Sequence, residues 1–128
     1  MTPVWVGRAL VNWLVEVSSV EEVVRAAPDM ERLAAVPGQG VILTAEGGIA
    51  GADLSSRYFG PAAGIPEDPV TGSAHCTLGP FWADRLGTTR LTCHQASRRG
   101  GIVYVEVRGE RVGLAGRAVT VMEGRLTV

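Results

Sequence analysis

Residues 73–86 constrain the fold of this chain more than any other segment, because they have the length of a helix and are apolar on nearly every side. A surface helix of a globular protein carries one apolar stripe, whereas a helix that is apolar all round needs protein around it. Gly87 follows, and glycine commonly ends a helix in the left-handed conformation. The sequence therefore predicts one buried central helix, whose apolar residues are Ala74, Cys76, Leu78, Phe81, Trp82, Ala83 and Leu86.

The segments before and after this helix are β in character. Ser19 and Asp29 each precede a short helical pattern and predict helix caps, with helices at 20–27 and 30–35. Glycine-bearing turns separate the predicted strands, which cover residues 10–17, 41–45, 52–59, 90–96, 102–107, 111–121 and 126–128. We therefore expect a single α+β domain over residues 1–128, with a curved, mainly antiparallel sheet wrapped around one buried helix.

Charge and residue usage exclude several function classes. The formal net charge is −1, without a basic run, which disfavours binding to the backbone of a nucleic acid. All 12 basic residues are arginine, so the chain has no lysine to anchor pyridoxal phosphate or to form a Schiff base. The N-terminus has no signal-peptide pattern and no apolar stretch is long enough to span a bilayer, which predicts a cytoplasmic protein.

The loop at residues 64–75 reads GIPEDPVTGSAH and leads into the predicted helix. The amide groups of Gly72, Ser73 and Ala74 at the start of a helix can hold an anion such as a carboxylate or an enolate. Glu67 and Asp68 lie just before them, stiffened by flanking prolines, as a substrate-orienting or proton-transferring group requires. Aspartate and serine at this position also serve as simple helix caps, so the pattern alone leaves both interpretations open.

The loop resembles a known family when it is taken with its flanking segments. Residues 57–59, the block EDPVTGSAH at 67–75, Trp82, and the run QASRRGG at 95–101 resemble the phenazine-biosynthesis-like (PhzF-type) isomerases, which share the fold of diaminopimelate epimerase. The resemblance covers the chain from about residue 10 to its end. It implies the C-terminal lobe of a two-lobed, cofactor-independent isomerase. The N-terminal lobe, which carries the family's main glutamate acid/base, is expected to be absent from this chain.

The resemblance also implies roles for individual residues. Asp68 is expected to be catalytic, as a substrate contact and a partner in proton transfer. Gly72, Ser73, Ala74 and His75 are expected to be substrate-binding, with His75 either supporting the loop, next to or at the edge of the cleft, or a core histidine. No metal or organic cofactor is implied.

Other residues that can carry chemistry have simpler interpretations. Diaminopimelate epimerases place a catalytic cysteine where this chain has Thr71, so a cysteine-pair mechanism is disfavoured, and we expect Cys76 and Cys93 to be packing residues. Ser73 and His75 lack the G-x-S-x-G pattern of a serine hydrolase. His94, isolated in a predicted strand, is expected to be structural.

The sequence leaves the roles of three arginines near the loop open. Arg98 and Arg99 form either an anion site or a solvated turn, and the resemblance favours one of them bracing the 67–75 loop. Arg57 leads toward the same loop, and we assign it no catalytic role.

These observations predict an isomerase lobe that abstracts a proton beside a carboxylate and returns it at another carbon of a small carboxylic acid. We expect the chain to be inactive alone and to pair as a homodimer or with a separate N-terminal-lobe chain. The alternative is a non-catalytic module from a truncated or split gene that dimerises and binds a small acid.

Overall fold

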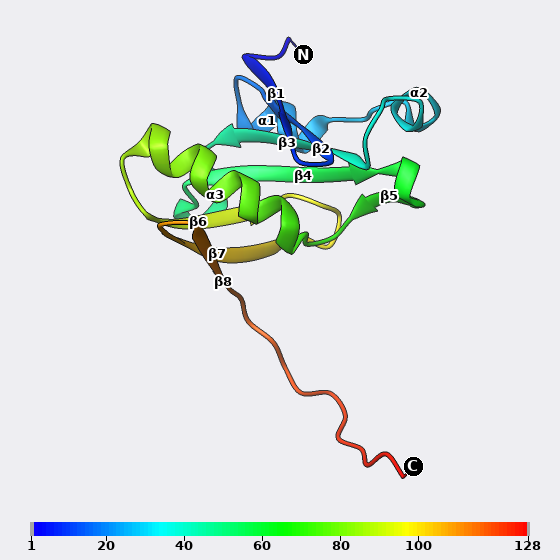
Figure 1. The fold of residues 1–128 in the computed structure, drawn as a ribbon, viewed down its shortest axis with the longest axis vertical. Coiled ribbons are helices and arrows are strands. Elements are labelled where there is room, and N and C mark those ends of the chain that lie inside the picture. The colour runs from blue at the N-terminus through cyan, green and yellow to red at the C-terminus, as the bar shows by residue number, and fades with distance from the viewer. Residues whose placement is uncertain (1, 128) are drawn as a thin grey trace.

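The computed structural model describes residues 2–127, which form one mixed sheet with helices on both of its faces (Figure 1). Within these residues the eight strands are β1 (Trp5–Ala9), β2 (Asn12–Glu16), β3 (Gly40–Glu46), β4 (Leu54–Gly60), β5 (Ile65–Asp68), β6 (Arg90–Gln95), β7 (Gly101–Arg108) and β8 (Arg111–Ala115). The helices of the same residues are α1 (Val20–Arg25), α2 (Met30–Ala34) and α3 (Gly72–Leu86), with 3₁₀ turns at Ile49–Gly51 and Pro61–Ala63.

The sheet runs in the order β1-β2-β3-β4-β6-β7-β8, and β5 pairs with β4 outside this path. Most neighbouring strands are antiparallel, as predicted, while β2–β3 and β4–β6 are parallel. The β4–β6 ladder is short: it joins only Leu54, Ser55 and Ser56 to Cys93, His94 and Gln95. This three-residue ladder connects the β1–β5 part of the sheet to the β6–β8 part.

Each face of the sheet has its own apolar cluster, because side chains alternate along a strand. Ile42 and Tyr58 face α3, in a cluster that also holds Leu78 and Trp82 of that helix. Their neighbours Leu43 and Phe59 face the other way and pack with Val17 and Val23 beside α1. Gly79 lets α3 lie close to the sheet, since a Cβ there would come within 2.7 Å of Val105 Cγ1.

Several local predictions are confirmed. Ser19 caps α1 by accepting a hydrogen bond from the Glu22 amide, and Asp29 caps α2. Gly87 follows α3 with a φ of 65°, the left-handed conformation that glycine adopts without steric cost. The strands predicted at 90–96 and 102–107 correspond to β6 and β7 within one residue at each end.

The prediction that the central helix is buried on all sides is wrong for this chain. Ala74, His75, Leu78, Gly79 and Trp82 of α3 are buried against the sheet. Opposite residues of the helix, including Ser73, Cys76 and Asp84, are exposed. The composition of the helix did not reveal which of its sides the rest of the chain covers.

The strand predictions at the two ends of the chain also need correction. The strand predicted at residues 10–17 corresponds to β2, which begins at Asn12 because Leu10 turns the chain with a φ of 55°. β1, which precedes this turn and pairs with β2, was not predicted. β8 ends at Ala115 rather than at residue 121, and residues 116–127 extend away from the sheet without helix or strand (Figure 1). The last predicted strand is therefore not found at residues 126–127, and Val128 lies outside the described residues.

Candidate functional site

The geometry of the site begins with β5, a short strand in the segment that was predicted to be a loop. Asp68 of β5 lies opposite Tyr58 of β4, and the register between these strands shifts toward Gly60 and Ile65. The chain then passes through Pro69 and Val70 and enters α3. β4 therefore sets the direction from which Asp68 approaches the start of the helix.

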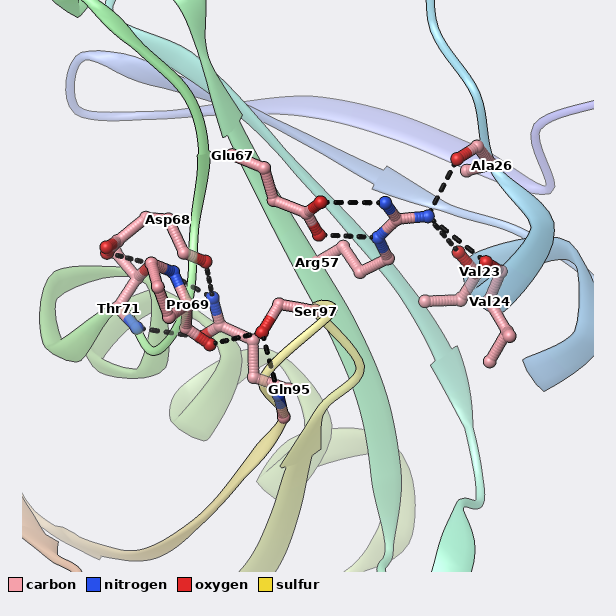
Figure 2. A network of polar contacts seen from close by, with 11 residues as sticks. Val23, Val24, Ala26, Arg57, Glu67, Asp68, Pro69, Thr71, Gln95 and Ser97 are labelled. Atoms are coloured by element: carbon pink, nitrogen blue, oxygen red, sulfur yellow. Dashed lines mark hydrogen bonds and ion pairs between the residues drawn. The ribbon is translucent and has the colours of Figure 1, made fainter.

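Glu67 has a structural partner, which separates it from the neighbouring Asp68. Arg57 binds it through two parallel contacts, Nε to Oε1 at 2.7 Å and Nη2 to Oε2 at 2.9 Å (Figure 2). The Arg57 Nη1 group also donates to the carbonyl oxygens of Val23, Val24 and Ala26 at the end of α1. The arginine that braces the loop is thus Arg57.

Arg98 and Arg99 are both exposed, and their guanidinium groups have no hydrogen bond or ion pair to any residue from 2 to 127. The expectation that one of them pairs with the acidic loop is wrong for this structure. The QASRRGG run contributes instead through Gln95 and Ser97. The Ser97 hydroxyl donates to the Pro69 carbonyl at 2.8 Å.

Asp68 is held by Thr71 and Gln95 (Figure 2). The Thr71 hydroxyl donates to Asp68 Oδ2 at 2.5 Å. Gln95 Nε2 donates to the Asp68 carbonyl at 2.7 Å and to the Thr71 hydroxyl at 3.1 Å, while Gln95 Oε1 accepts from the Thr71 amide at 2.7 Å. Thr71 and Gln95 are buried, whereas Asp68 is half-buried. The Asp68 carboxylate is therefore held from the protein interior and remains partly accessible to solvent.

The charge of Asp68 influences a buried tyrosine. Burial raises the pKa of Tyr58 above its ordinary value, and the negative charge of Asp68 raises it further. The Tyr58 hydroxyl donates to Asn12 Oδ1 at 3.1 Å and is therefore neutral at physiological pH.

The start of α3 carries no side-chain cap. Thr71 occupies the N-cap position, but its hydroxyl is engaged by Asp68 and Gln95 and not by a helix amide. Within residues 2–127 the amides of Gly72, Ser73 and Ala74 have no acceptor, and Gly72 and Ser73 are exposed. The helix thus presents free N–H groups and the positive end of its dipole beside the Asp68 carboxylate.

His75 does not line this helix start. Its side chain is fully buried, and Nδ1 lies 2.7 Å from the Thr71 carbonyl oxygen. Burial lowers the pKa of His75, an effect that the hydrogen bond to Thr71 partly opposes. In this structure His75 contacts the site from behind, through Thr71.

Two hollows flank the loop. A groove of about 900 Å³ extends from Val70 and Gly72 across β7 and β8, and its lining also includes Tyr104, Leu114, Arg99 and Arg117. A smaller hollow of about 350 Å³ lies beside Glu67 and Ser97. The larger groove opens at the free helix start.

The two cysteines differ from each other. Cys93 is buried, as predicted, and burial together with the charge of Asp53 raises its pKa to about 12. Cys76 is exposed on α3, so the prediction that it is a packing residue is wrong.

Among residues 2–127 no group of three or more His, Cys, Asp or Glu side chains is arranged to hold a metal ion. No helix in this part of the chain is long and apolar enough to cross a membrane.

A comparison with protein families identifies the chain. A family model described as "Phenazine biosynthesis-like protein" matches residues 2–124. The chain belongs to the phenazine biosynthesis-like family. The resemblance drawn from the 67–75 block is therefore confirmed.

Relatives within this family share both sequence and structure with the chain. It is 53% identical over 107 residues to an uncharacterized isomerase of Pseudomonas aeruginosa, a match that covers 83% of the chain and 40% of the relative. It is 40% identical over 124 residues to an uncharacterized isomerase of Halalkalibacterium halodurans, covering 97% of the chain and 47% of the relative.

A solved structure described as a putative phenazine biosynthesis PhzC/PhzF protein from Clostridium difficile superimposes with a TM-score of 0.88 at 35% identity, over 100% of this chain and 49% of that one. A PhzF-family structure from Enterococcus faecalis gives a TM-score of 0.82 at 38% identity, over 87% of this chain and 42% of that one. The chain spans less than half the length of each of these four proteins.

Sequence reasoning missed Gln95, the residue that organises the site. Leu91, Cys93 and Gln95 alternate along β6 and are all buried. A glutamine at the third position of an apolar alternation was the available signal, because a buried amide needs polar partners.

Proposed function

We propose that this chain is the C-terminal lobe of a two-lobed, cofactor-independent isomerase. Relatives that are about twice as long and bear the name isomerase support this assignment. The reaction breaks a C–H bond beside a carboxylate, passes the proton to a base on the enzyme, and returns a proton to another carbon as the double bond shifts. No electrons are gained or lost, so the reaction needs no redox partner.

The observation that carries the proposal is the position of Asp68 beside an uncapped helix start. The amides of Gly72, Ser73 and Ala74 and the Ser73 hydroxyl are suited to bind a carboxylate or the enolate that forms as the proton leaves. Asp68, kept in place by its 2.5 Å hydrogen bond from Thr71, is suited to orient the substrate and to accept or return a proton. His75 contributes by supporting Thr71, because its buried ring is behind the loop.

The exposed side of α3 supports the view that a second lobe belongs over it. Ser73 and Cys76 lie on that side, next to the free amides. In the complete protein α3 would be the central helix around which the sheet curves, and the substrate would lie between the lobes. We propose that the chain acts in the cytoplasm and pairs with a separate N-terminal-lobe chain or with a second copy of itself.

Deuterium incorporation tests this function. The chain is incubated in D₂O with a panel of small unsaturated carboxylic acids, alone and together with an N-terminal-lobe polypeptide prepared from a full-length relative, and uptake is followed by mass spectrometry. We expect uptake above buffer only when both lobes are present, because the second acid/base is expected on the other lobe. Asp68→Asn should abolish uptake, whereas Asp84→Asn, on the exposed side of the same helix, should not.

Two results would overturn the proposal. Uptake by the two-lobe mixture that persists in Asp68→Asn would remove Asp68 from the proton-transfer step. Full uptake by the 128-residue chain alone would show that the second lobe is not required.

A further inference from the structure

Residues 117–123, RAVTVME, have the composition of a β-strand but pair with no other part of the described chain. They follow β8 and extend away from the sheet (Figure 1). No backbone hydrogen bond joins residues 117–127 to residues 2–115. Val119, Val121 and Met122 are almost fully exposed. Apolar side chains that lie exposed next to one another usually mark a surface that a partner covers.

The segment is apolar on both of its faces when it is extended. Side chains alternate along a strand, so Val119 and Val121 share one face. Ala118 and Met122 share the other face with Thr120. Side chains of a strand pack against those of its neighbour on each face. The segment therefore fits beside an edge strand that is itself apolar on both faces.

β1 is an edge strand of this kind. It lies at one end of the sheet and, among residues 2–127, pairs only with β2. On the face toward α3 it carries Trp5, whose ring centroid lies 5.1 Å from that of Phe81. On the opposite face Val6 is 51% exposed. β1 has none of the lysines, prolines or bulges that commonly protect an edge strand, so its outer edge is open to another strand.

The edge at the other end of the sheet, β8, fits the segment less well. Val112 of β8 packs in the apolar cluster beside α3. On the face away from α3 the strand carries Arg111 and Gly113, which offer little apolar surface. We therefore take β1 as the edge that the segment matches.

One parallel alignment matches the segment to β1 side chain by side chain. On the face away from α3 its lateral pairs are Val119 with Val4, Val121 with Val6, and Glu123 with Arg8. Arg8 donates to the Pro37 carbonyl at 3.1 Å and has no acidic partner among residues 2–127. An antiparallel alignment of the same valines places Arg117 opposite Arg8 instead, and like charges directly opposite each other are destabilising. Charge thus favours the parallel direction.

A strand on the β1 edge would also cover part of α3. Both edge strands of the sheet reach this helix: Trp5 of β1 packs near its C-terminal end, and Leu114 of β8 approaches its start. Cys76 lies on the exposed side of α3. In the parallel alignment Met122 is on the α3 face, and its flexible side chain is suited to fill the space beside Trp5.

We propose that in a dimer of this chain residues 118–123 of each copy form a parallel strand on the outer edge of β1 of the other copy. The exchange is reciprocal, so a two-fold dimer makes the same contact twice. The choice of a second copy as the partner rests on the proposed function, in which the chain pairs with itself. The strand-like segment and the open edge do not depend on that function.

Analytical ultracentrifugation of the 128-residue chain tests the exchange. We expect a monomer–dimer equilibrium that Val121→Lys weakens about a hundredfold, because each dimer buries this side chain twice and each burial is worth roughly a factor of ten. Leu126→Lys, at an equally exposed position outside the segment, is the matched control and should leave the dissociation constant unchanged. A monomer at every concentration, or equal effects of the two substitutions, would overturn the proposal.

Charge variants test the alignment and the partner together. Glu123→Arg and Arg8→Glu should each weaken self-association, because each places like charges side by side in both contacts of the dimer. Mixing the two variants should restore association, since both contacts of the mixed dimer then join opposite charges. A segment that paired with β1 of its own chain would give no such recovery, so a mixture as weak as the separate variants would refute the exchange.

Hydrogen exchange gives a measurement that needs no substitution in β1, and it decides the matter if Arg8→Glu does not fold. The amides of β1 should exchange more slowly as the concentration of the wild-type chain rises, and this protection should vanish in Val121→Lys. The outer edge of β8 should show no such change. Protection that appears at β8 and not at β1 would contradict the assigned edge.

Deuterium uptake in the two-lobe mixture separates the exchange from the proposed function. A wild-type chain that stays monomeric alone, with uptake that Asp68→Asn abolishes, would refute the exchange and leave the function standing. Association through β1 with uptake unaffected by Asp68→Asn would refute the function of Asp68 and leave the exchange standing. Binding of the segment by the N-terminal-lobe polypeptide without self-association of the chain would also refute the exchange.

Discussion

Gln95 holds Thr71 through both atoms of its side-chain amide: Oε1 accepts from the Thr71 amide at 2.7 Å, and Nε2 donates to the Thr71 hydroxyl at 3.1 Å. The same Nε2 also reaches the Asp68 carbonyl at 2.7 Å. A single buried side chain on β6 therefore fixes both the end of β5 and the first residue before α3. The candidate site depends on β6 as much as on the loop that carries its reactive groups.

Replacing Gln95 should destabilise the chain strongly. In Gln95→Leu the Thr71 amide and the Asp68 carbonyl lose their partner while they remain largely shielded from water, and such an unsatisfied buried group costs about 1–3 kcal/mol. We expect a loss of about 2–6 kcal/mol for the two groups in urea unfolding. Gln39→Leu, at an exposed position, is the matched control and should change stability little. A loss below that of the control would show that the Gln95 bonds are not needed.

Arg57 is expected to be structural and not catalytic. Arg57→Met leaves Glu67 unpaired and also removes the contacts to the end of α1. Breaking a buried pair costs about 3–5 kcal/mol, and because Glu67 keeps 22% of its side chain exposed we expect about 2–3 kcal/mol in thermal or urea unfolding. Arg98→Met, with an exposed side chain, is the control. A double-mutant cycle with Glu67→Gln should give a coupling free energy above 1 kcal/mol in magnitude, on the order of that for a shielded pair; additive effects would contradict the paired geometry.

Acid should weaken the fold through its buried histidines. Burial lowers the pKa of His75 and of His94 in the folded state, so the unfolded chain takes up protons at a higher pH than the folded chain does. Stability from this source is complete above about pH 6.5, the ordinary histidine pKa, and falls as the pH drops below it, by at most about 1.4 kcal/mol per pH unit for each histidine. Unfolding free energies at pH 7.5, 6.5 and 5.5 check this. His75→Asn should reduce the slope between pH 6.5 and 5.5, and an unchanged slope in both His75→Asn and His94→Asn would refute the explanation.

The two cysteines should react at very different rates. Cys93 is buried and its pKa is raised to about 12, so almost none of it is thiolate at pH 8. Cys76 is exposed on α3. Iodoacetamide at pH 8 should therefore label Cys76 in the folded chain, and both residues only after unfolding in urea, as read by peptide mass spectrometry. Equal labelling of the two thiols without denaturant would mean that the β4–β6 region opens readily.

The exposed side of α3 should mediate association. We expect light scattering across a dilution series to give an average mass that rises with concentration, because Cys76 is exposed on α3 and Trp5, whose ring packs against Phe81 of α3, is 39% exposed. Cys76→Arg, which places a charge on the exposed side of α3, should lower the mass. Glu110→Arg, in the turn between β7 and β8, should not. A monomeric mass at every concentration would show that the chain needs no partner to cover this side.

The sequence predicted those elements that local chemistry specifies. Helix caps, turn glycines and runs of β-branched residues determine α1, α2, β6 and β7, and each is where it was expected. β5 could not be predicted in the same way, because its sequence IPED has little strand propensity and it becomes a strand only by pairing with β4. Residues 116–121 show the reverse case: they have a strand-like sequence, but no neighbour within residues 2–127 pairs with them.

The residues of the candidate site were predicted from the sequence, but their hydrogen-bond partners were not. The loop pattern placed Asp68 beside the amides of a helix start, and the structure brings these groups together. It could not separate Asp68 from Glu67, since their different partners come from β6 and β4, far away in the sequence. The exposure of one side of α3 could not be predicted for a similar reason. An apolar residue such as Cys76 does not show whether the residues that would bury it belong to the same chain.

The shortness of the β4–β6 ladder has a consequence for how the molecule opens. Three residue pairs join the two parts of the sheet, whereas β3–β4 and β6–β7 are each joined by six. Hydrogen exchange in a folded protein proceeds through the opening of cooperative units that differ in stability. The β4–β6 ladder should therefore open before either part of the sheet unfolds. During this opening α3, which packs on both parts of the sheet, would still connect them. Gln95 lies at the end of the ladder, so each such opening would also release Thr71 and Asp68, and the lifetime of the assembled site would be the lifetime of that junction.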